Sequence, residues 1–251
     1  QRIYWKPVDG DPRPVTPESL AGTLARYSDF LIRGTEIWCV REVTEGPNTA
    51  RDLIAISSTD EIRVLDSTSH FYAHLALSPD QNQLAWISWE HPQMPWDGTE
   101  LRIATIDSAG NLIDQEVCAG SINEAVTSPV WSQSGSLYYI NDSSGFWNIW
   151  ELDSDLAKRQ LVSESAEWAH PMWLVGTHLL RILDDGQLVG VHGSPAREQI
   201  AIVDPATGTW RDLACDLNNF AHLSVSKDRI YAIGGGPKTL SALIELSART
   251  A

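Results

Sequence analysis

The feature that most constrains the fold of this 251-residue chain is an internal repeat. A hairpin pattern, in which an apolar residue is followed by a short polar turn and a second apolar run, begins at Leu31, Leu77, Trp131, Trp173 and Val225. The spacings between these starts are 46, 54, 42 and 52 residues. Repeats on this scale are typical of solenoids and propellers, in which each repeat is one supersecondary unit. The chain is therefore expected to consist of successive copies of one small unit.

Each of these hairpins is followed by a second one. Residues 53–56 and 62–65 are one example, and residues 101–106 and 115–117 are another. Alternation of side chains puts apolar residues on both faces of such a sheet, so each four-stranded unit needs cover on both sides. Four-stranded meanders that recur without helical segments between them predict an all-β propeller. A sandwich of two stacked sheets is the alternative, but it does not explain the recurring order of hairpins.

The repeat predicts one propeller domain over residues 1–251, with four complete blades and a partial blade at each end. The complete blades are predicted at 25–66, 71–119, 124–163 and 165–213, and the partial blades at 1–17 and 218–246. The chain is then either a fragment of a larger propeller or a five-bladed ring closed by strand exchange between its ends. In the blade at 165–213, the inner hairpin lies either at 173–179 or at 180–189, where an Asp-Asp-Gly turn is equally suitable.

The charge of the chain excludes some classes of partner. With 18 Lys and Arg against 33 Asp and Glu, the net charge of −15 repels phosphate backbones and anionic lipid headgroups, so neither nucleic acid nor a membrane is expected as a partner. No apolar run approaches the roughly 20 residues of a membrane-spanning helix, and the first residues lack a signal-peptide pattern. Cys39, Cys118 and Cys215 are far apart and are expected to be buried, reduced thiols, which favours a cytoplasmic location. The eleven tryptophans are expected to pack between blades or to line a concave surface.

A recurring aromatic-Ala-His pattern ends at His74, His170 and His222, each three residues before a repeat start. The same register gives Ser28 and Ser128 in the other blades. Because innermost strands line the channel of a propeller, these five polar residues are predicted to form a hydrated channel lining. The three histidines could in addition hold a water cluster, an anion or a metal. No metal site is assigned, since His70 and His74 lie roughly 13 Å apart in a strand and cannot clamp zinc.

The segment WEHPQMPWDGTEL at residues 89–101 is predicted to be a long loop between the second and third strands of its blade. Its prolines stiffen it, and Asp97-Gly98 supplies a turn. In a meander this loop shares a rim with the connections between blades. The predicted rim residues are Trp96, Asp97, Glu124 and Glu167. They are expected to recognise the cationic amino terminus of a peptide or to dock another domain, because carboxylates are suitable partners for an ammonium group; simple solvation is the alternative.

Several segments resemble a known family. LSPD at 77–80 is followed by LAWISWEHPQMPWDGTEL at 84–101, and CVRE at 39–42, SPVWS at 128–132, SGFWN at 144–148 and EWAHPMW at 167–173 support the same match. Together they resemble the propeller of bacterial prolyl oligopeptidase family enzymes of the dipeptidyl aminopeptidase and acylaminoacyl-peptidase type. The resemblance implies a seven- or eight-bladed propeller that caps a C-terminal α/β-hydrolase domain, in which Ser, Asp and His cleave short peptides.

The chain departs from that family in one respect. An α/β-hydrolase carries its nucleophile in a Gly-x-Ser-x-Gly turn, and this string is absent from the 251 residues. No catalytic residue and no cofactor is therefore assigned, and the chain alone is not expected to be an enzyme. The predicted function is that of a non-catalytic, substrate-gating propeller of a serine peptidase, with an α/β-hydrolase domain of the same polypeptide and short peptides as partners. A free-standing propeller that binds a protein or a ligand is the alternative.

Overall fold

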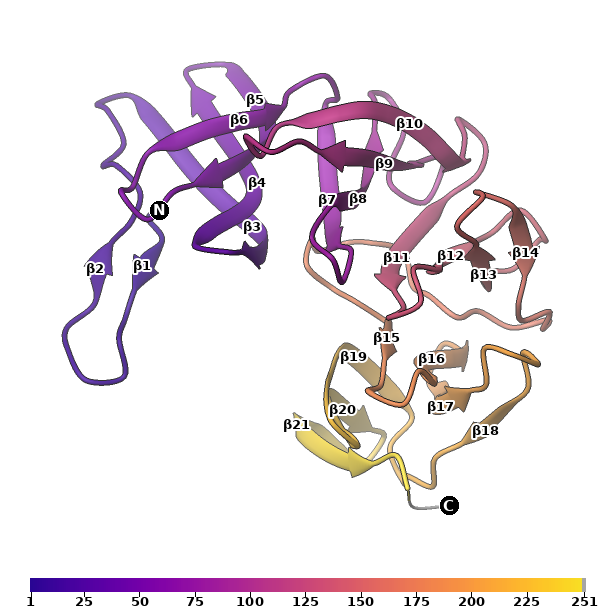
Figure 1. Ribbon diagram of the computed structural model, residues 1–251. Coiled ribbons are helices and arrows are strands. Elements are labelled where there is room, and N and C mark those ends of the chain that lie inside the picture. The colour runs from indigo at the N-terminus through magenta and orange to yellow at the C-terminus, as the bar shows by residue number, and fades with distance from the viewer. Residues whose placement is uncertain (250–251) are drawn as a thin grey trace.

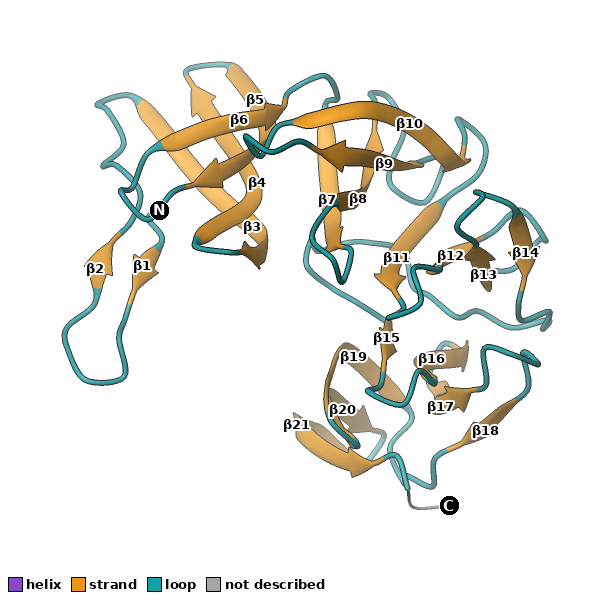
Figure 2. Cartoon of the chain, viewed as in Figure 1, coloured by secondary structure: helices purple, strands orange, loops and turns teal. Residues whose placement is uncertain are grey.

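The structure is a computed structural model that describes residues 1–249, and every regular element in this range is a β-strand (Figure 2). The strands are β1 (Tyr4–Trp5), β2 (Arg13–Pro14), β3 (Thr23–Arg33), β4 (Glu36–Glu45), β5 (Asn48–Ile56), β6 (Ile62–Asp66), β7 (Phe71–Leu77), β8 (Gln83–Trp89), β9 (Glu100–Ile106), β10 (Leu112–Gly120), β11 (Val126–Trp131), β12 (Leu137–Asn141), β13 (Asn148–Leu152), β14 (Lys158–Gln160), β15 (Leu180–Ile182), β16 (Leu188–Ser194), β17 (Arg197–Val203), β18 (Trp210–Asp212), β19 (Asn219–Ser226), β20 (Arg229–Gly236) and β21 (Thr239–Ser247). Within residues 1–249, no helix has the length and apolar character that a membrane span requires.

The strands form five antiparallel sheets that stand as propeller blades around a common axis (Figure 1). Four sheets have four strands each, namely β3–β6, β7–β10, β11–β14 and β15–β18, and the fifth consists of β19–β21. Each sheet is a meander, in which strands that follow one another in sequence pair with one another. The inner strands β3, β7, β11, β15 and β19 contact one another in this order. The predicted all-β propeller is therefore confirmed.

The two ends of the chain form separate small sheets. Strands β1 and β2 pair with each other in a two-stranded ribbon, and β21 pairs with β20 at the edge of its sheet. Figure 1 shows the ribbon and the first blade standing apart from the last blade. Strand exchange that would join the two ends into one blade is thus not found within residues 1–249.

The inner hairpin of the fourth blade is the second of the two predicted alternatives. Residues 173–179 form no strand, whereas β15 and β16 pair across the Asp-Asp-Gly turn. In that turn the Leu183 amide donates to the Gln187 carbonyl (2.9 Å) and the Gly186 amide donates to the Leu183 carbonyl (2.9 Å). Gly186 has a φ of 87°, a conformation that glycine adopts without strain. The sheet therefore begins at Leu180, and residues 161–179 are a long connection rather than the start of a blade.

Large apolar side chains fill the spaces between neighbouring blades. Trp38 and Leu53 of the first blade form one cluster with Tyr72 and Trp86 of the second, and all four are at most 2% exposed. Trp168 is completely buried in a second cluster that joins the third, fourth and fifth blades. Burial of one large apolar side chain stabilises a fold by about 1.5 to 3 kcal/mol, so these clusters hold adjacent sheets face to face. This is one of the two places that the sequence predicts for its tryptophans.

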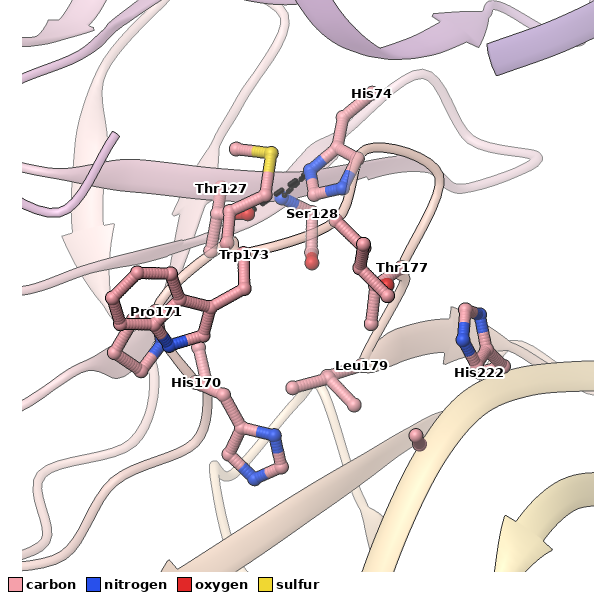
Figure 3. A pocket seen from close by; sticks show the side chains of 13 residues that line it. His74, Thr127, Ser128, His170, Pro171, Trp173, Thr177, Leu179 and His222 are labelled. Carbon is pink, nitrogen blue, oxygen red and sulfur yellow. Dashed lines mark hydrogen bonds between the residues drawn. The ribbon is translucent and has the colours of Figure 1, made fainter. Parts of the chain in front are cut away.

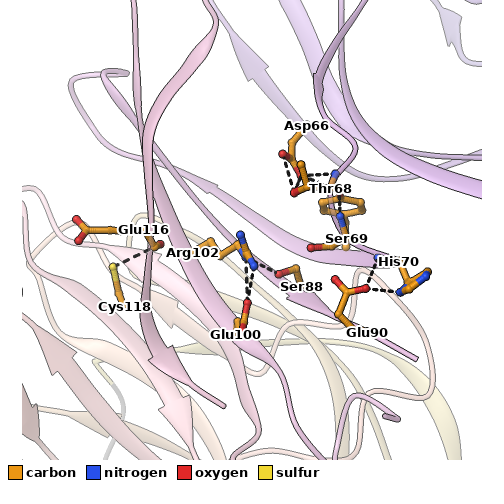
Figure 4. Close-up of polar contacts among 11 residues, drawn as sticks. Asp66, Thr68, Ser69, His70, Ser88, Glu90, Glu100, Arg102, Glu116 and Cys118 are labelled. Atoms are coloured by element: carbon orange, nitrogen blue, oxygen red, sulfur yellow. Dashed lines mark hydrogen bonds and ion pairs between the residues drawn. The ribbon is translucent and has the colours of Figure 1, made fainter. Parts of the chain in front are cut away.

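The connection between the first two blades, in which Figure 4 shows Asp66, Thr68 and Ser69, is held by a buried hydrogen-bond chain through Tyr72. The Tyr72 hydroxyl donates to Asp66 Oδ2 (2.6 Å) and accepts from the Ser69 amide (2.7 Å). Asp66 also accepts from the amide and the hydroxyl of Thr68 (3.2 and 3.1 Å). The phenol therefore satisfies two groups of the connection at once.

The substitution Tyr72→Phe is expected to lower the free energy of unfolding by about 1 to 3 kcal/mol, because it removes the bond that the Ser69 amide makes and the shortest hydrogen bond to Asp66. Chemical denaturation measures this effect. Tyr138→Phe is the matched control: Tyr138 is also buried, but the hydrogen bond from its hydroxyl to Glu151 is longer, at 3.3 Å, so the loss should be smaller. Equal losses in the two variants would contradict this account of the connection.

Candidate functional site

The loop between β8 and β9 is anchored to the connection between the second and third blades. The Thr99 amide donates to the Glu124 carbonyl (3.0 Å), and the Thr99 hydroxyl exchanges hydrogen bonds with the carbonyl and amide of Val126 (2.8 and 2.7 Å). Gly98 lies so close to this connection that an added Cβ would be 2.3 Å from the Ile122 carbonyl oxygen. The loop and the connection therefore lie on the same rim of the propeller, as a meander predicts.

Trp96 and Glu167 come together at a cavity on this rim. The cavity, here called the rim pocket, has a volume of about 330 Å³. Its lining includes Trp96, Trp147, Glu167, His170, Pro195 and Glu198. The ring of Trp96 also contacts the ring of Trp173, with 4.3 Å between centroids. The pocket thus has aromatic walls and two carboxylates.

The two carboxylates of the rim pocket differ in the number of hydrogen bonds and ion pairs that they form with the protein. Glu198 is buried; it pairs with His170 Nε2 (2.8 Å) and accepts from the Phe220 amide (2.7 Å). Glu167 is half-buried and accepts from the Trp147 amide through Oε2 (2.9 Å). No other hydrogen bond to the Glu167 side chain is formed within residues 1–249, so Glu167 has more capacity for a ligand than Glu198.

The other two predicted rim residues lie outside this pocket. Asp97 is exposed and accepts from the Met94 amide (3.0 Å), so its side chain stabilises the turn of its own loop. Glu124 is half-buried, and its backbone bonds Ser121 and Thr99. Both residues are on the rim, but neither lines the rim pocket with Trp96 and Glu167.

The inner strands of four blades share one irregularity that positions the channel side chains. Each has a β-bulge at which one residue takes a left-handed backbone conformation, with φ between 51° and 55°. These residues are Asp29 in β3, His74 in β7, Ser128 in β11 and His222 in β19. Non-glycine residues rarely adopt this conformation, so its recurrence marks equivalent positions. In the first blade the equivalent residue is Asp29, which follows the predicted Ser28.

A second cavity, here called the channel cavity, lies at these bulges and has a volume of about 190 Å³ (Figure 3). His74, Ser128, His170 and His222 all line it, together with Thr127, Trp173, Thr177 and Leu179. His170 reaches it from the connection at 161–179 rather than from an inner strand. Ser28 lies elsewhere, in a hollow shared with Tyr27 and Phe71 between the first two blades.

The bulged residues are linked from blade to blade by hydrogen bonds. Asp29 Oδ2 accepts from the amide of His74 (3.1 Å), and His74 Nδ1 accepts from the amide of Ser128 (3.1 Å). The Thr127 hydroxyl also contacts His74 Nδ1 (3.0 Å). At the bulges of His74 and Ser128, the backbone amide is therefore bonded by the side chain of the preceding bulged residue. Because Nδ1 accepts from an amide, the proton of the neutral His74 ring is on Nε2.

Four ionisable groups lie beside the channel; His74 is buried, and Asp29, His178 and Arg181 are half-buried. Burial raises the pKa of Asp29 to about 6, although the His74 amide and Arg181 oppose this shift. Burial lowers the pKa of His74 to about 4, with a further contribution from Arg181. Burial lowers the pKa of His178 to about 2, with further contributions from His74, Arg181 and His222. Burial also lowers the pKa of Arg181 to about 10. At neutral pH the cluster therefore holds one carboxylate, one guanidinium and two uncharged imidazoles.

Sequence reasoning missed Asp29, His178, Arg181 and Glu198. No sequence signal marks Asp29, because the bulge that positions it is visible only in the strand pairing of the structure. His178 and Arg181 would follow from choosing the hairpin at 180–189. No sequence signal marks Glu198, since its burial depends on the fifth blade. Among the residues described, no three His, Cys, Asp or Glu side chains are arranged to hold a metal ion.

No family model and no curated protein matches the chain. Among solved structures, a puromycin-hydrolyzing peptidase of Mycobacterium tuberculosis is 32% identical over 100% of this chain, with a TM-score of 0.90. A puromycin hydrolase is 32% identical over 98% of the chain, with a TM-score of 0.89. The match to prolyl oligopeptidase B of Galerina marginata covers 86% of this chain with a TM-score of 0.64. At 11% sequence identity, this match shows only a shared fold.

The matched region is a limited part of the two similar peptidases. The chain spans 41% of the length of the first and 40% of the second. The match extends over 98 to 100% of this chain, with 32% of the aligned residues identical. The chain therefore belongs to the β-propellers of the prolyl oligopeptidase family of peptidases.

Proposed function

We propose that this propeller is a non-catalytic domain that gates access to an α/β-hydrolase domain of the same polypeptide, which cleaves short peptides. The observation that carries the proposal is the match over the whole chain to two peptidases that are more than twice as long. The absence of a Gly-x-Ser-x-Gly turn from the 251 residues also supports it, because the chain offers no nucleophile of the hydrolase type.

The proposed gating is steric. A ring of rigid blades admits short or unfolded peptides to an enclosed active site and excludes folded proteins. The interblade clusters around Trp38 and Trp168 make such a ring stiff, since each joins at least two sheets through fully buried side chains.

The rim pocket is the part of the propeller that we propose contacts the substrate. Trp96 supplies an aromatic wall, and Glu167 supplies a carboxylate with capacity for the ammonium group of a peptide. Asp97 and Glu124 lie outside it and are proposed to face the docked catalytic domain. Large exposed apolar side chains near the same loops, such as Ile122 (66% exposed) and Trp173 (73%), fit such a docking surface.

The chain by itself is expected to hydrolyse no peptide ester or amide. This is measured with chromogenic aminoacyl and dipeptidyl substrates after repeated purification. Continuing the reading frame past Ala251 is expected to give a Gly-x-Ser-x-Gly turn and, on expression, peptidase activity. Turnover that stays with the 251-residue chain through purification would overturn the non-catalytic assignment. A stop codon directly after Ala251 would favour the free-standing binding module instead.

In the extended protein, Glu167→Gln is expected to raise KM at least about tenfold for peptides with a free amino terminus, because a charge-assisted hydrogen bond is lost. Amino-terminally acetylated peptides should be unaffected. Asp97→Asn is the matched control, since Asp97 lies on the same rim but outside the rim pocket. An equal effect on free and acetylated peptides would remove Glu167 from amine recognition.

A further inference from the structure

The hollow between the first two blades contains two arginines, and it is here called the arginine pocket. It has a volume of about 250 Å³ and shares no lining residue with the rim pocket or the channel cavity. Its lining combines two guanidinium groups and one carboxylate with aliphatic and aromatic side chains, among them Arg26, Glu42, Arg51, Val40, Phe71 and Trp89. Apolar walls with a few convergent polar groups are typical of small-molecule sites.

Strand register brings the three charged side chains together. Arg26 of β3 lies opposite Glu42 of β4, and Glu42 lies opposite Arg51 of β5. Side chains that lie directly opposite one another on paired strands share one face of the sheet. Val40 and Leu53, two residues further along β4 and β5, are on the same face and pack against the second blade. The charged side chains therefore lie on the face of the first blade that meets the second.

The aromatic wall of the pocket belongs to the second blade. Phe71 of β7 lies opposite Trp89 of β8, and Trp89 is the last residue before the 90–99 loop. The turn between β4 and β5 lies at the same end of its sheet, because alternate turns of a meander share one edge. The arginine pocket is thus on the same rim of the propeller as the rim pocket.

One positive charge of the arginine pocket is not balanced by its lining. Glu42 Oε1 accepts from Arg26 Nη1 (2.8 Å), and Glu42 Oε2 accepts from Arg51 Nε (2.9 Å) with Nη2 at 2.7 Å. Desolvation raises the pKa of Glu42, but the two guanidinium groups outweigh this effect and hold the pKa below its usual value. Glu42 is the only carboxylate among the described residues that line the pocket. Two guanidinium charges against one carboxylate leave a positive site on a chain whose net charge is −15.

Both guanidinium groups keep N–H groups for a ligand. Arg51 donates one further hydrogen bond, from Nη1 to the His70 carbonyl (3.3 Å). Arg26 forms no hydrogen bond besides the one to Glu42 within residues 1–249. A guanidinium group has five N–H donors, so each of these two can also donate to an added acceptor.

The Arg51 guanidinium is held in position by an aromatic stack. Its central carbon lies 4.3 Å from the centroid of the Phe71 ring, and this ring stacks on Trp89 with 5.0 Å between centroids. The Arg51 side chain is 22% exposed, compared with 53% for Arg26. A guanidinium that is stacked on one face and already paired loses little freedom when a carboxylate binds at its edge. Arg51 is therefore a preorganised donor, and Arg26 is the more accessible one.

We propose that the arginine pocket binds the carboxylate of a small molecule that also carries an apolar side chain, which is the chemistry of the carboxyl-terminal residue of a peptide. The carboxylate accepts hydrogen bonds from Arg26 and Arg51, and the apolar side chain lies against Val40 and Trp89. At about 250 Å³ the pocket is smaller than the roughly 300 to 1,000 Å³ of pockets for drug-sized ligands, so its occupant is about as large as one amino-acid residue.

The proposal deepens the proposed function, on which the peptide nature of the ligand rests. The rim pocket offers a carboxylate and the arginine pocket offers guanidinium groups, so the two oppositely charged ends of short peptides find complementary sites on one rim. Binding to the arginine pocket is measured on the 251-residue chain alone, whereas gating is tested through the activity of the extended protein. A failure of one is therefore distinct from a failure of the other.

The test is isothermal titration calorimetry with three probes. N-acetyl-L-phenylalanine is expected to bind, and N-acetyl-L-phenylalaninamide, which lacks the carboxylate, is expected to bind at least about tenfold more weakly because charge-assisted hydrogen bonds are lost. The third probe, 3-phenylpropionate, has the carboxylate and the ring but no peptide group. Weaker binding of this probe than of N-acetyl-L-phenylalanine would support a peptide end as the ligand, and equal or tighter binding would overturn that part of the proposal. Equal binding of the amide, or no binding of N-acetyl-L-phenylalanine, would overturn the whole.

Two variants locate the site. Arg26→Gln is expected to weaken the binding of N-acetyl-L-phenylalanine at least about tenfold, and it leaves the pair between Arg51 and Glu42 in place. Arg51→Gln is expected to have at least the same effect, because it removes the stacked donor. Arg13→Gln is the matched control: Arg13 is 51% exposed and paired with one carboxylate, Asp60 (2.9 Å), but it lies outside the pocket. Unchanged binding in both Arg26→Gln and Arg51→Gln, or an equal loss in Arg13→Gln, would show that the probe binds elsewhere.

Discussion

The substitution Gly98→Ala is expected to destabilise the protein by about 3 kcal/mol or more and to detach the 90–99 loop from the rim. A Cβ at this position would lie 2.3 Å from the Ile122 carbonyl oxygen and 2.6 Å from that of Ser121. Both atoms belong to the backbone, so no side chain can move to relieve the contact. The nearby hydrogen bond from the Thr99 amide to the Glu124 carbonyl (3.0 Å) must then lengthen or break.

The rim pocket should be lost together with this contact, because Trp96 is held in place by the same loop. Chemical denaturation measures the loss of stability. A change in tryptophan fluorescence reports the separation of Trp96 from Trp173, whose ring centroids are 4.3 Å apart in the native protein. Gly236→Ala is the matched control: its nearest neighbour to an added Cβ is 3.7 Å away and its φ is not in the left-handed region, so it should be nearly neutral. Equal stability of the two variants would contradict the close approach at Gly98.

Acidification from pH 6.5 to pH 4 is expected to lower the free energy of unfolding by about 3 to 4 kcal/mol through the channel cluster. The pKa of His74 is about 4 and that of His178 is about 2 in the native protein, both below the ordinary value of 6.5. The unfolded chain therefore binds these two protons first as the pH falls. Each histidine reduces stability progressively below pH 6.5, by about 3 kcal/mol at pH 4.

Asp29 acts in the opposite direction. Its native pKa of about 6 lies above the ordinary value of 3.8, so the folded protein binds this proton first. Between pH 6 and pH 4 it returns about 2 kcal/mol of stability. Because two histidines oppose one carboxylate, the net effect is a loss on acidification, and it begins below pH 6.5.

Denaturant unfolding at pH 7, 5.5 and 4.5 measures the slope of the free energy of unfolding against pH. His178→Gln should flatten the slope, since it removes the group with the larger shift, whereas Asp29→Asn should steepen it. His91→Gln is the control, because His91 is exposed on the 90–99 loop. A steeper slope in His178→Gln, or a flatter one in Asp29→Asn, would contradict the protonation states of the cluster.

The blades and the common rim could be predicted from the sequence for a simple physical reason. Each blade is a local unit, in which consecutive strands pair through short turns, so turn residues and alternating apolar residues already contain the information. The position of the 90–99 loop beside the connection at 120–125 follows from the meander alone. The turn at Gly98 and the placement of Trp96 and Glu167 on one rim follow from the order of the strands in the meander.

The residues that the sequence did not reveal depend on neighbouring blades. Asp29 takes its position from a β-bulge, which shifts the register of β3 between Ser28 and Leu31 and replaces the predicted Ser28 by the next residue. The hairpin at 180–189 forms because its turn is completed by Gly186, while the segment at 173–179 remains in a connection that closes the channel cavity. Glu198 is buried where it meets the Phe220 amide of the next blade and His170 of the 161–179 connection.

The sequence by itself determined the repeating four-stranded unit, because strand pairing within a blade is local and leaves a periodic pattern in the chain. Only the tertiary structure decided which polar side chains meet in the channel and which of them, like His74 Nε2, have no hydrogen-bond partner among residues 1–249. Those contacts join residues of different blades, and a displacement of a single residue at a bulge changes which side chain faces the axis.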